Sequence, residues 1–314
     1  MAKVALSGFG AIGSEILRYL IDRKHEVVAV IDTDPGKAGR TVRQLSGLEC
    51  DVKISGSLED AKLSDAEVGV LSTRSRLDQI AIDIEHLISK GLDVVTTSEE
   101  VAYPVYSGLE ASIRIDTLAK ERGVTVVGIG VNPGFVMDWV PSLVASATKN
   151  PSRIHVVRSV NVSRRRRQLQ TKTGVGLTRT KFEKGVAGGV LGHVGLVESA
   201  HLIALSMGKE LDELRSGIFP VLGSEDYVMG VRQFAEGKAG DCAIRLDLEM
   251  TITSADFDVV EVKGEPNLKL RFENGVFGDS ATVALAVNAV ERIRFARPGL
   301  ITVLELPLVK SGTL

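Results

Sequence analysis

The stretch "KVALSGFGAIGSEILRYL", residues 3–20, decides the fold of the N-terminal part of the chain. A short apolar strand runs into a glycine-rich turn, and apolar residues at helical spacing follow the turn. In such a turn the first glycine permits the tight bend, the second lets the backbone approach a diphosphate, and the third allows close packing of helix on strand. The N-terminus of the helix also favours negative charge. The sequence therefore predicts a dinucleotide site formed by Gly8, Phe9, Gly10, Ala11, Ile12 and Gly13.

An acid closes the next predicted strand, "EVVAVID" (26–32), about 20 residues after the turn, where a carboxylate commonly contacts the adenosine ribose. Asp32 favours NAD over NADP, because a carboxylate repels a 2′-phosphate. The following "TDPGKAGR" (33–40) leaves this preference open, since Lys37 and Arg40 could reach a phosphate or simply be solvated. The predicted cofactor is NAD or NADP, with NAD favoured.

Strand-like and helix-like segments alternate through the first half of the chain. The predicted strands are 3–8, 26–32, 65–73, 92–98 and 124–130, and the predicted helices are 13–24, 77–91 and 109–122. Strands that alternate with helices indicate a parallel sheet covered on both faces. The sequence therefore predicts an α/β fold with an N-terminal doubly wound parallel sheet of the Rossmann type.

The pattern changes after about Pro151, where long alternating strands separated by turns indicate a mixed or antiparallel sheet in a second α+β domain. The predicted strands are 153–164, 241–254 and 259–274, and the predicted helices are 195–208 and 226–236. The last predicted helix, 278–296, is apolar enough to pack back on the first domain. We expect a dinucleotide-binding domain at 1–135, a substrate-binding and dimerisation domain at 136–277 and a return segment at 278–314.

Three segments reach the carboxyl ends of the predicted parallel strands, which is where open sheets of this kind bind ligands. They contribute the candidate cofactor contacts Ser72, Thr73, Thr97, Asn132, Pro133 and Gly134. The segment "TTSEE" (96–100) also carries Glu99 and Glu100. Ser98 could cap a helix that these acids begin, and one of the acids could bind a cationic substrate. The two interpretations do not exclude each other.

The second predicted domain offers a basic loop and one histidine. The run "RRRR" (164–167) could bind a substrate carboxylate, face a partner chain or be solvated. His193 lies between glycines just before a predicted helix, which would leave its ring unusually accessible. We therefore consider His193 a candidate site residue.

Composition argues against several other classes of protein. The 314 residues carry a formal net charge of −2, which does not indicate binding to nucleic acid or to an anionic membrane. Cys50 and Cys242 form no zinc pattern, so we expect no metal site and a reduced, cytoplasmic protein. The N-terminus does not resemble a signal peptide, and no apolar run approaches the roughly 20 residues that span a bilayer.

Seven segments occur in an order that resembles one known family: "GFGAIG", "VIDTDPGKAGR", "TTSEEVAYP", "GIGVNPGFVMDWVP", "RRRRQLQTKTGVGLT", "GHVGLVES" and "GDSATVALAVNAVERIRFARPGLITVLELP". From about residue 3 to residue 308 the chain is similar to the 2,4-diaminopentanoate dehydrogenases and the related native amine dehydrogenases. The resemblance implies an N-terminal domain like that of dihydrodipicolinate reductase, an α+β second domain and a homodimer. It also implies NAD(P)-dependent oxidative deamination of a small-molecule amine, with reductive amination as the reverse reaction.

The resemblance also implies roles for particular residues. A carboxylate from Glu99 or Glu100 would contact the reacting nitrogen, and His193 would line the substrate pocket. The segment at Asn132, Pro133 and Gly134 would lie by the nicotinamide. Further substrate contacts are expected from the basic loop, at Arg167, Gln170 and Thr173.

Two other functions fit the same fold. A dehydrogenase of a hydroxy or aldehyde substrate, such as homoserine or a semialdehyde, more often uses lysine or histidine at the strand end that here carries two glutamates. The arginine run (164–167) would suit an anionic substrate and keeps this alternative open. A non-catalytic nucleotide sensor is the third possibility, because a fold alone does not establish catalysis.

Overall fold

The computed structural model describes residues 1–306, with the side chains of Ser107 and Glu225 left aside. The chain divides into two compact units. The first comprises Met1–Gly134 together with the segment that begins at Gly278, and the second is Phe135–Phe277. The chain therefore leaves the first unit once and returns to it once.

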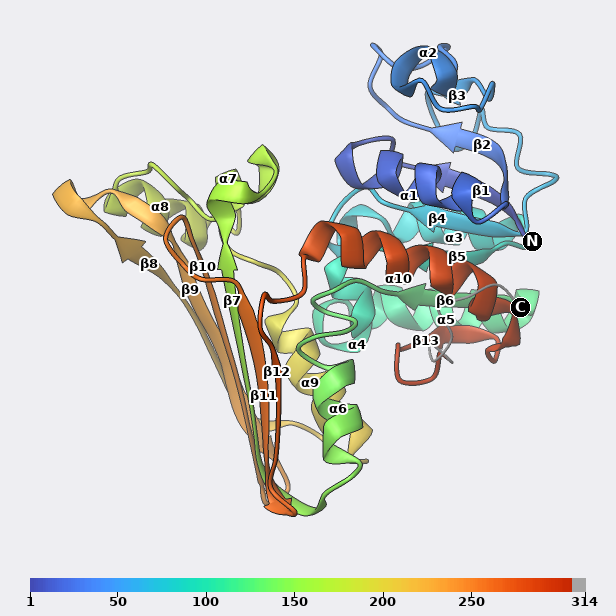
Figure 1. The fold of residues 1–314 in the computed structure, drawn as a ribbon. Coiled ribbons are helices and arrows are strands. Elements are labelled where there is room, and N and C mark those ends of the chain that lie inside the picture. The colour runs from blue at the N-terminus through green and yellow to red at the C-terminus, as the bar shows by residue number, and fades with distance from the viewer. Residues whose placement is uncertain (307–314) are drawn as a thin grey trace. The chain divides into compact units, whose positions relative to one another are not determined.

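Within residues 1–306, the first unit carries a seven-stranded parallel sheet in the order β13-β6-β5-β4-β1-β2-β3 (Figure 1). Its strands are β1 (Lys3–Ser7), β2 (Glu26–Ile31), β3 (Ile54–Ser55), β4 (Val68–Leu71), β5 (Asp93–Thr96), β6 (Thr125–Gly128) and β13 (Gly299–Ile301). Neighbouring strands are parallel throughout the sheet. All residues of β4 and β6 are buried, as expected for central strands with both faces covered. The predicted doubly wound parallel sheet is confirmed.

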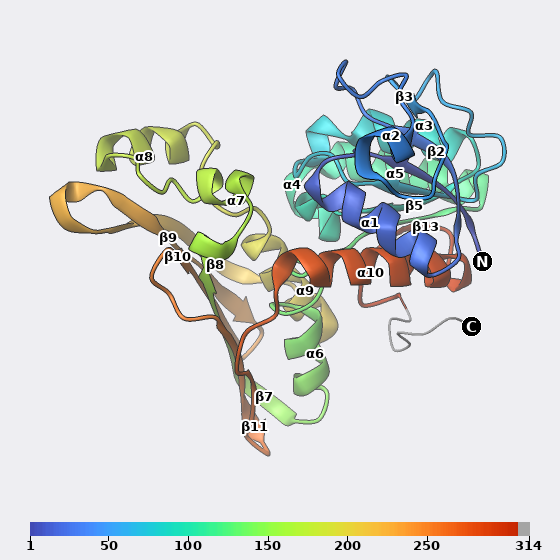
Figure 2. The ribbon, with the colours of Figure 1, turned by 45° about the horizontal axis from the view of Figure 1, so that its top comes forward.

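Helices cover both faces of this sheet. They are α1 (Ala11–Asp22), α2 (Val42–Ser46), α3 (Ala81–Ser89), α4 (Pro104–Ser107), α5 (Leu109–Arg122) and α10 (Gly278–Arg292). On one face, Ile84 of α3 and Ile115 of α5 share a buried cluster with Val94 of β5. On the other face α10 lies beside α1 (Figure 2). Arg23, just past α1, donates to Glu291 of α10 at 2.7 Å, so this helix belongs to the first unit.

Among the described residues, the second unit carries a six-stranded mixed sheet in the order β12-β11-β7-β10-β9-β8. Its strands are β7 (Lys149–Asn161), β8 (Asp212–Leu222), β9 (Val228–Ala239), β10 (Cys242–Thr251), β11 (Phe257–Glu265) and β12 (Leu268–Phe272). β7 and β10 pair in parallel, and the other neighbours are antiparallel. Its helices are α6 (Trp139–Ala145), α7 (Arg167–Lys172), α8 (Arg179–Ala187) and α9 (Leu196–Ser206). α6 and α9 pack against the sheet, whose opposite face is rich in charged side chains.

One predicted helix, 226–236, is wrong, because strand β9 occupies this part of the chain. Its buried residues Val231, Gln233 and Ala235 alternate with the more exposed Arg232 and Phe234. β9 pairs with β8 on one side and β10 on the other. Every second side chain of β9 is buried, and both of its edges pair with other strands. These tertiary contacts outweigh the helix propensity of the residues at its end. Strand β8 was not predicted at all.

Short 3₁₀ turns complete the described structure. They are η1 (Leu77–Gln79), η2 (Glu99–Ala102), η3 (Val162–Arg164), η4 (Ser224–Asp226) and η5 (Ile293–Phe295). In residues 1–306, no helix combines the length and the apolar character needed to cross a membrane. Among the described side chains, no three histidines, cysteines or acids are grouped so as to hold a metal ion. Cys50 and Cys242 are free and buried, and burial raises the pKa of both thiols, so they remain protonated at neutral pH.

Candidate active site

The glycine turn joins β1 to α1, and its glycines differ in the space around them. Gly8 has φ +95°, and a Cβ there would lie 2.4 Å from the Ser72 carbonyl oxygen. A Cβ on Gly13 would lie 1.8 Å from the Gly8 carbonyl oxygen. At Gly10 nothing lies within 4 Å of an added Cβ. Gly8 and Gly13 are therefore required by the protein itself, whereas Gly10 faces open space where a ligand could approach.

The N-terminus of α1 suits a diphosphate. Gly10 is its N-cap residue, and no side chain caps the helix. The first turn carries no acid. Its backbone N–H groups and the positive end of the helix dipole are therefore available to an anion. The Phe9 side chain is buried and Ala11 is exposed, so the turn presents mainly backbone to the solvent.

Asp32 follows β2 and is bound to the glycine turn. Its Oδ2 accepts from the Phe9 N–H at 2.8 Å and from Lys37 Nζ at 2.9 Å, and its Oδ1 accepts from the Asp34 N–H at 2.9 Å. Burial alone raises the pKa of Asp32. The hydrogen bonds from Asp34, Lys37 and Phe9 outweigh burial, so the pKa lies below its usual range. Asp32 is thus an ionised carboxylate beside the turn, as ribose recognition requires.

Residues after β4 and β5 gather at the same edge of the sheet. The Thr97 hydroxyl lies 3.5 Å from the Ser72 hydroxyl, and the Thr97 N–H donates to the Leu71 carbonyl. Thr73 Cγ2 would lie 3.0 Å from a Cβ on Gly8. Ser72, Thr73 and Thr97 therefore line the carboxyl edge of the sheet next to the glycine turn.

The two acids after β5 have different environments. Glu100 is 8% exposed, and its Oε2 accepts from the Leu77 N–H at 2.7 Å. Its Oε1 lies 3.9 Å from a guanidinium nitrogen of Arg76. Glu100 therefore fixes the loop between β4 and α3, whereas Glu99 is only half-buried.

Ser98 does not cap a helix before these acids. No side-chain cap is present at η2, and the Ser98 hydroxyl donates instead to the Arg74 carbonyl. The helix expected after the strand is a 3₁₀ turn, because the buried Ser98 hydroxyl is already engaged with the neighbouring loop. This turn holds Glu99 at the carboxyl edge of the sheet.

A compact turn follows β6. The Asn132–Pro133 peptide bond is cis, and Asn132 is buried. Gly134 has φ +117°, and a Cβ there would lie 2.5 Å from the Gly130 nitrogen. The Val131 N–H donates to the Thr282 hydroxyl of α10 at 3.2 Å. The predicted nicotinamide contacts therefore lie in a closely packed turn of the first unit that is hydrogen-bonded to α10.

The basic loop of the second unit divides into buried and exposed residues. Arg165 is 7% exposed, and its guanidinium lies 3.8 Å from the centre of the Phe277 ring. Arg167, the first residue of α7, is exposed. Gln170 donates to the Arg165 carbonyl at 2.8 Å, and the buried Thr173 hydroxyl donates to the Gln170 carbonyl at 2.8 Å. One arginine of the run thus stabilises the loop, and α7 brings the three predicted substrate contacts together.

His193 is held by a residue that the sequence did not indicate. Buried Gln233 of β9 accepts from the His193 N–H at 2.5 Å and donates to the His193 carbonyl at 3.0 Å. Gly192 and Gly195 have φ of +107° and +117°, so a sharply bent backbone flanks the histidine. The contact joins residues 40 positions apart, and β9 was predicted as a helix. No local pattern could have identified Gln233.

Comparison with known proteins places these features in one family. A model of the 2,4-diaminopentanoate dehydrogenase C-terminal domain matches residues 135–313, more than half of the chain. The chain belongs to the 2,4-diaminopentanoate dehydrogenase family. A member, the 2,4-diaminopentanoate dehydrogenase of Acetoanaerobium sticklandii, is 29% identical over 98% of this chain and 94% of its own length. The family resemblance drawn from the sequence motifs is confirmed, and the protein is a dehydrogenase.

Solved structures share the fold. The amine dehydrogenase of Mycobacterium smegmatis aligns with a TM-score of 0.87 at 23% identity, covering 98% of this chain and 96% of that one. The WlbA dehydrogenase of Thermus thermophilus, solved with NAD and UDP-GlcNAcA, aligns with a TM-score of 0.57 at 15% identity, covering 90% and 86%. At these identities the likeness concerns the fold. It agrees with the two sheets described above.

Proposed function

We propose that the protein catalyses the NAD(P)-dependent oxidative deamination of an amine or diamino acid, and the reverse reductive amination. The observation that carries this proposal is the half-buried Glu99 beyond β5, at the edge of the sheet that also carries the glycine turn. A carboxylate can bind a substrate ammonium group and accept its proton, and amine oxidation needs both. Membership of the family supports the same reaction.

Residues of the first unit would hold the cofactor. The open turn at Gly10 and the uncapped α1 N-terminus fit its diphosphate, and Asp32 fits the adenosine ribose. Ser72, Thr73, Thr97 and the Asn132–Gly134 segment are the proposed contacts toward the nicotinamide. When bound, the oxidised nicotinamide supplies the hydride acceptor.

Glu99 is the proposed general base. Its carboxylate binds the substrate ammonium and takes one N–H proton, while the carbon that bears nitrogen loses a hydride. The substrate becomes an iminium ion while Glu99 holds the proton as a neutral carboxyl group, and that proton is later released to water. Water then adds to that carbon, and the C–N bond breaks to release ammonia and a carbonyl product. General base catalysis of this kind typically contributes about 10²–10⁴-fold to the rate.

Glu100 is the proposed positioning residue. Its Oε2 already accepts from the Leu77 N–H, and burial within the loop leaves it little room for a substrate. By holding η2 against the loop after β4, it fixes the backbone that carries Glu99. In the second unit, we propose His193, Arg167 and Gln170 as substrate contacts. We propose that Thr173, predicted as a further contact, instead positions Gln170, because its buried hydroxyl donates to the Gln170 carbonyl.

A substrate panel tests the function. NAD⁺ and NADP⁺ reduction is measured at alkaline pH with 2,4-diaminopentanoate, simple amines, diamino acids and hydroxy acids. We expect turnover with an amine and release of ammonia. Turnover with hydroxy acids alone would reject the deaminase. Tight dinucleotide binding without turnover on any class would support a nucleotide sensor.

Substituting Gln233 tests the proposed role of His193. Gln233→Leu leaves the His193 N–H and carbonyl without their partners, each of which costs about 1–3 kcal/mol when buried. We expect a lower melting temperature and an amine KM raised about tenfold, with NADH affinity unchanged. Gln233→Glu keeps an acceptor for the His193 N–H but faces the His193 carbonyl with a buried carboxylate, so it should lower the melting temperature at least as much. A lower melting temperature with an unchanged KM would show that the segment around His193 does not contact substrate.

The cofactor is NAD or NADP, and NAD is favoured. Asp32 is ionised and lies beside the turn, where it suits the free ribose hydroxyls of NAD. The preference between the two cofactors is measured as the ratio of kcat/KM for NAD⁺ to kcat/KM for NADP⁺, with one amine as substrate.

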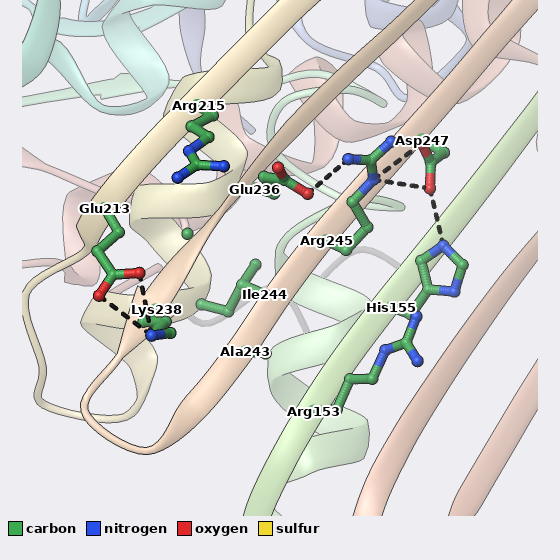
Figure 3. A pocket seen from close by; sticks show the side chains of 11 residues that line it. Arg153, His155, Glu213, Arg215, Glu236, Lys238, Ala243, Ile244, Arg245 and Asp247 are labelled. Atoms are coloured by element: carbon green, nitrogen blue, oxygen red, sulfur yellow. Dashed lines mark hydrogen bonds and ion pairs between the residues drawn. The ribbon is translucent and has the colours of Figure 1, made fainter.

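We further propose a homodimer formed through the charged face of the second sheet. On this face Phe219 and Phe234 stack with ring centres 6.1 Å apart, and the Arg245 guanidinium lies 4.2 Å above Phe234. Arg245 also donates to Glu236 and Asp247 at 2.6 Å (Figure 3). The exposed ring of Phe219, surrounded by side chains of both charge signs, suits a two-fold interface, where each patch meets a copy of itself.

The charges of this face persist over a wide pH range. Burial raises the pKa of Asp247, but hydrogen bonds from His155 and Arg245 outweigh it and lower that pKa to about 2. A carboxyl whose folded pKa is lowered contributes stability above its unfolded pKa and loses it as the pH falls through the folded value. The Arg245–Asp247 pair is therefore intact at neutral pH and is lost near pH 2.

Phe219→Glu should dissociate the dimer. Phe219 is 53% exposed, so the monomer tolerates the change, whereas a buried glutamate in the interface does not. Phe295→Glu in the first unit is the matched control, because Phe295 is 58% exposed. Sedimentation equilibrium should give a two-chain mass for the parent and the control, and a one-chain mass for Phe219→Glu. A two-chain mass for all three proteins would place the interface elsewhere.

We also propose that the protein is cytoplasmic. Both cysteines are free and buried, which suits a reducing compartment. Fractionation of cells that produce the protein tests this location.

A further inference from the structure

A buried ion pair holds the last segment of the second unit. Arg158 of β7 and Asp258 of β11 lie opposite each other in the sheet, and Arg158 Nη1 donates to Asp258 Oδ1 at 2.9 Å. Arg158 Nη2 also donates to the Val276 carbonyl at 2.8 Å, and the Val276 N–H donates to Asp258 Oδ2 at 2.6 Å. Burying two charges costs free energy that pairing only partly regains, so the pair by itself is weak evidence for stability. Its contacts with Val276, however, bind both the donor and the acceptor of one peptide segment and so fix the direction of the next residue.

Phe277 is that next residue, and it ends the second unit. Its side chain is 50% exposed, so core packing alone does not hold the ring. The ring is covered by Arg165, whose guanidinium lies 3.8 Å from the ring centre. Arg165 is 7% exposed, and a cation on an aromatic face gains most when water is excluded from it. The ring therefore determines where the Arg165 side chain lies.

Arg165 also fixes the start of α7. Its N–H donates to the Val162 carbonyl at 3.0 Å, and its carbonyl accepts from the Gln170 side chain at 2.8 Å. α7 begins two residues later, at Arg167. With its amide nitrogen bound to Arg165, Gln170 can accept from a substrate ammonium group through its amide oxygen. Displacing Arg165 would therefore move both substrate contacts proposed on α7.

We propose that Phe277 is a positioning residue for amine binding. Its ring holds Arg165, and Arg165 in turn places Arg167 and Gln170 of α7. This inference rests on the proposed function, in which Arg167 and Gln170 contact the substrate. Phe277 acts through Arg165 and not on the reacting atoms, so it affects amine binding rather than hydride transfer.

Amine kinetics separate this role from a purely structural one. Phe277→Leu keeps an apolar side chain but removes the aromatic face. From the strength of a largely desolvated cation–π contact, we expect the amine KM to rise about tenfold and kcat to stay within about threefold of the parent. A melting curve checks that each variant is folded, and a titration with NADH should give the parental affinity.

Two further variants control this experiment. Phe277→Tyr keeps an aromatic face of the same size, so its amine KM should stay within about threefold of the parent. Phe295→Leu in the first unit is the matched control, because Phe295 is 58% exposed and the Arg294 guanidinium lies 4.8 Å from its ring centre. It removes the same kind of contact from the unit that does not contain α7, and it should leave the amine KM unchanged.

Any of three results would overturn the proposal. They are an unchanged amine KM in Phe277→Leu, a KM in Phe277→Tyr as high as in Phe277→Leu, and an equal rise in Phe295→Leu. In each of these cases the parent still oxidises an amine, so the proposed function survives. A folded parent that turns over no amine would reject the proposed function, and this inference with it.

Discussion

Glu99→Gln should lower amine-dependent reduction of NAD⁺ by about a thousandfold and leave NADH affinity unchanged. Glutamine has nearly the same shape as glutamate, but it carries no charge and cannot accept the ammonium proton. The half-buried position of Glu99 means that the substitution removes no core packing. The measurement is initial-rate kinetics with the amine found in the panel, alongside NADH titration and a melting curve.

Glu100→Gln is the matched control, because it makes the same chemical change one residue away. The amide oxygen of glutamine can still accept from the Leu77 N–H, so the loop keeps its anchor. We expect turnover within about tenfold of the parent and a modest loss of stability, since a carboxylate is the stronger acceptor. If Glu100→Gln is inactive and Glu99→Gln is active, the roles of the two acids are reversed. If both variants keep parental turnover, no carboxylate of this pair is the base.

Gly10→Val should weaken binding of NADH by about a hundredfold or more, and its cost to the free protein should be limited to about 1 kcal/mol for a poorer N-cap residue. Gly10 has φ −91° and ψ −160°, an extended conformation that valine readily adopts. Nothing lies within 4 Å of an added Cβ, so the side chain starts into the open space proposed for the diphosphate. The measurements are a fluorescence titration with NADH and a melting curve without cofactor.

Two other glycines give the controls for this experiment. A Cβ on Gly56 meets only the Ala38 side chain at an ordinary 3.7 Å, so Gly56→Ala should change neither stability nor affinity. Gly13→Ala should destabilise the free protein, because its Cβ would lie 1.8 Å from the Gly8 carbonyl oxygen. If Gly10→Val binds NADH like the parent, the diphosphate does not bind at this turn.

The sequence predicted correctly those features that depend on residues close together in the chain. The strand, turn and helix around Gly8–Gly13 were predictable because glycine spacing and apolar periodicity act locally. The hydrogen bond that joins Asp32 to the glycine turn could not be read from spacing, although the position of the acid could. Strand β9 was wrongly predicted to be a helix. Its strand conformation depends on hydrogen bonding to β8 and β10, which the residues of β9 alone do not reveal.

The candidate site residues show the same difference between local and long-range features. The sequence indicated that acids follow β5, but it could not separate Glu99 from Glu100. That distinction depends on the Leu77 N–H, which belongs to another loop and faces only one of the two side chains. The contact between Gln233 and His193 could not be predicted for the same reason, because the two residues are 40 positions apart in the chain. The fold was therefore more predictable than the environment of each site residue.

The late return of the chain to its first unit has a consequence for synthesis on the ribosome. β13 (Gly299–Ile301) pairs with β6 (Thr125–Gly128), and α10 packs beside α1. Until the whole second unit has been translated, β6 therefore has one unpaired edge, and the apolar residues of α10 are not yet present to pack beside α1. Exposed edges and apolar faces in a nascent chain promote aggregation. The N-terminal part of this chain thus has to wait for its last strand and helix until translation is nearly complete.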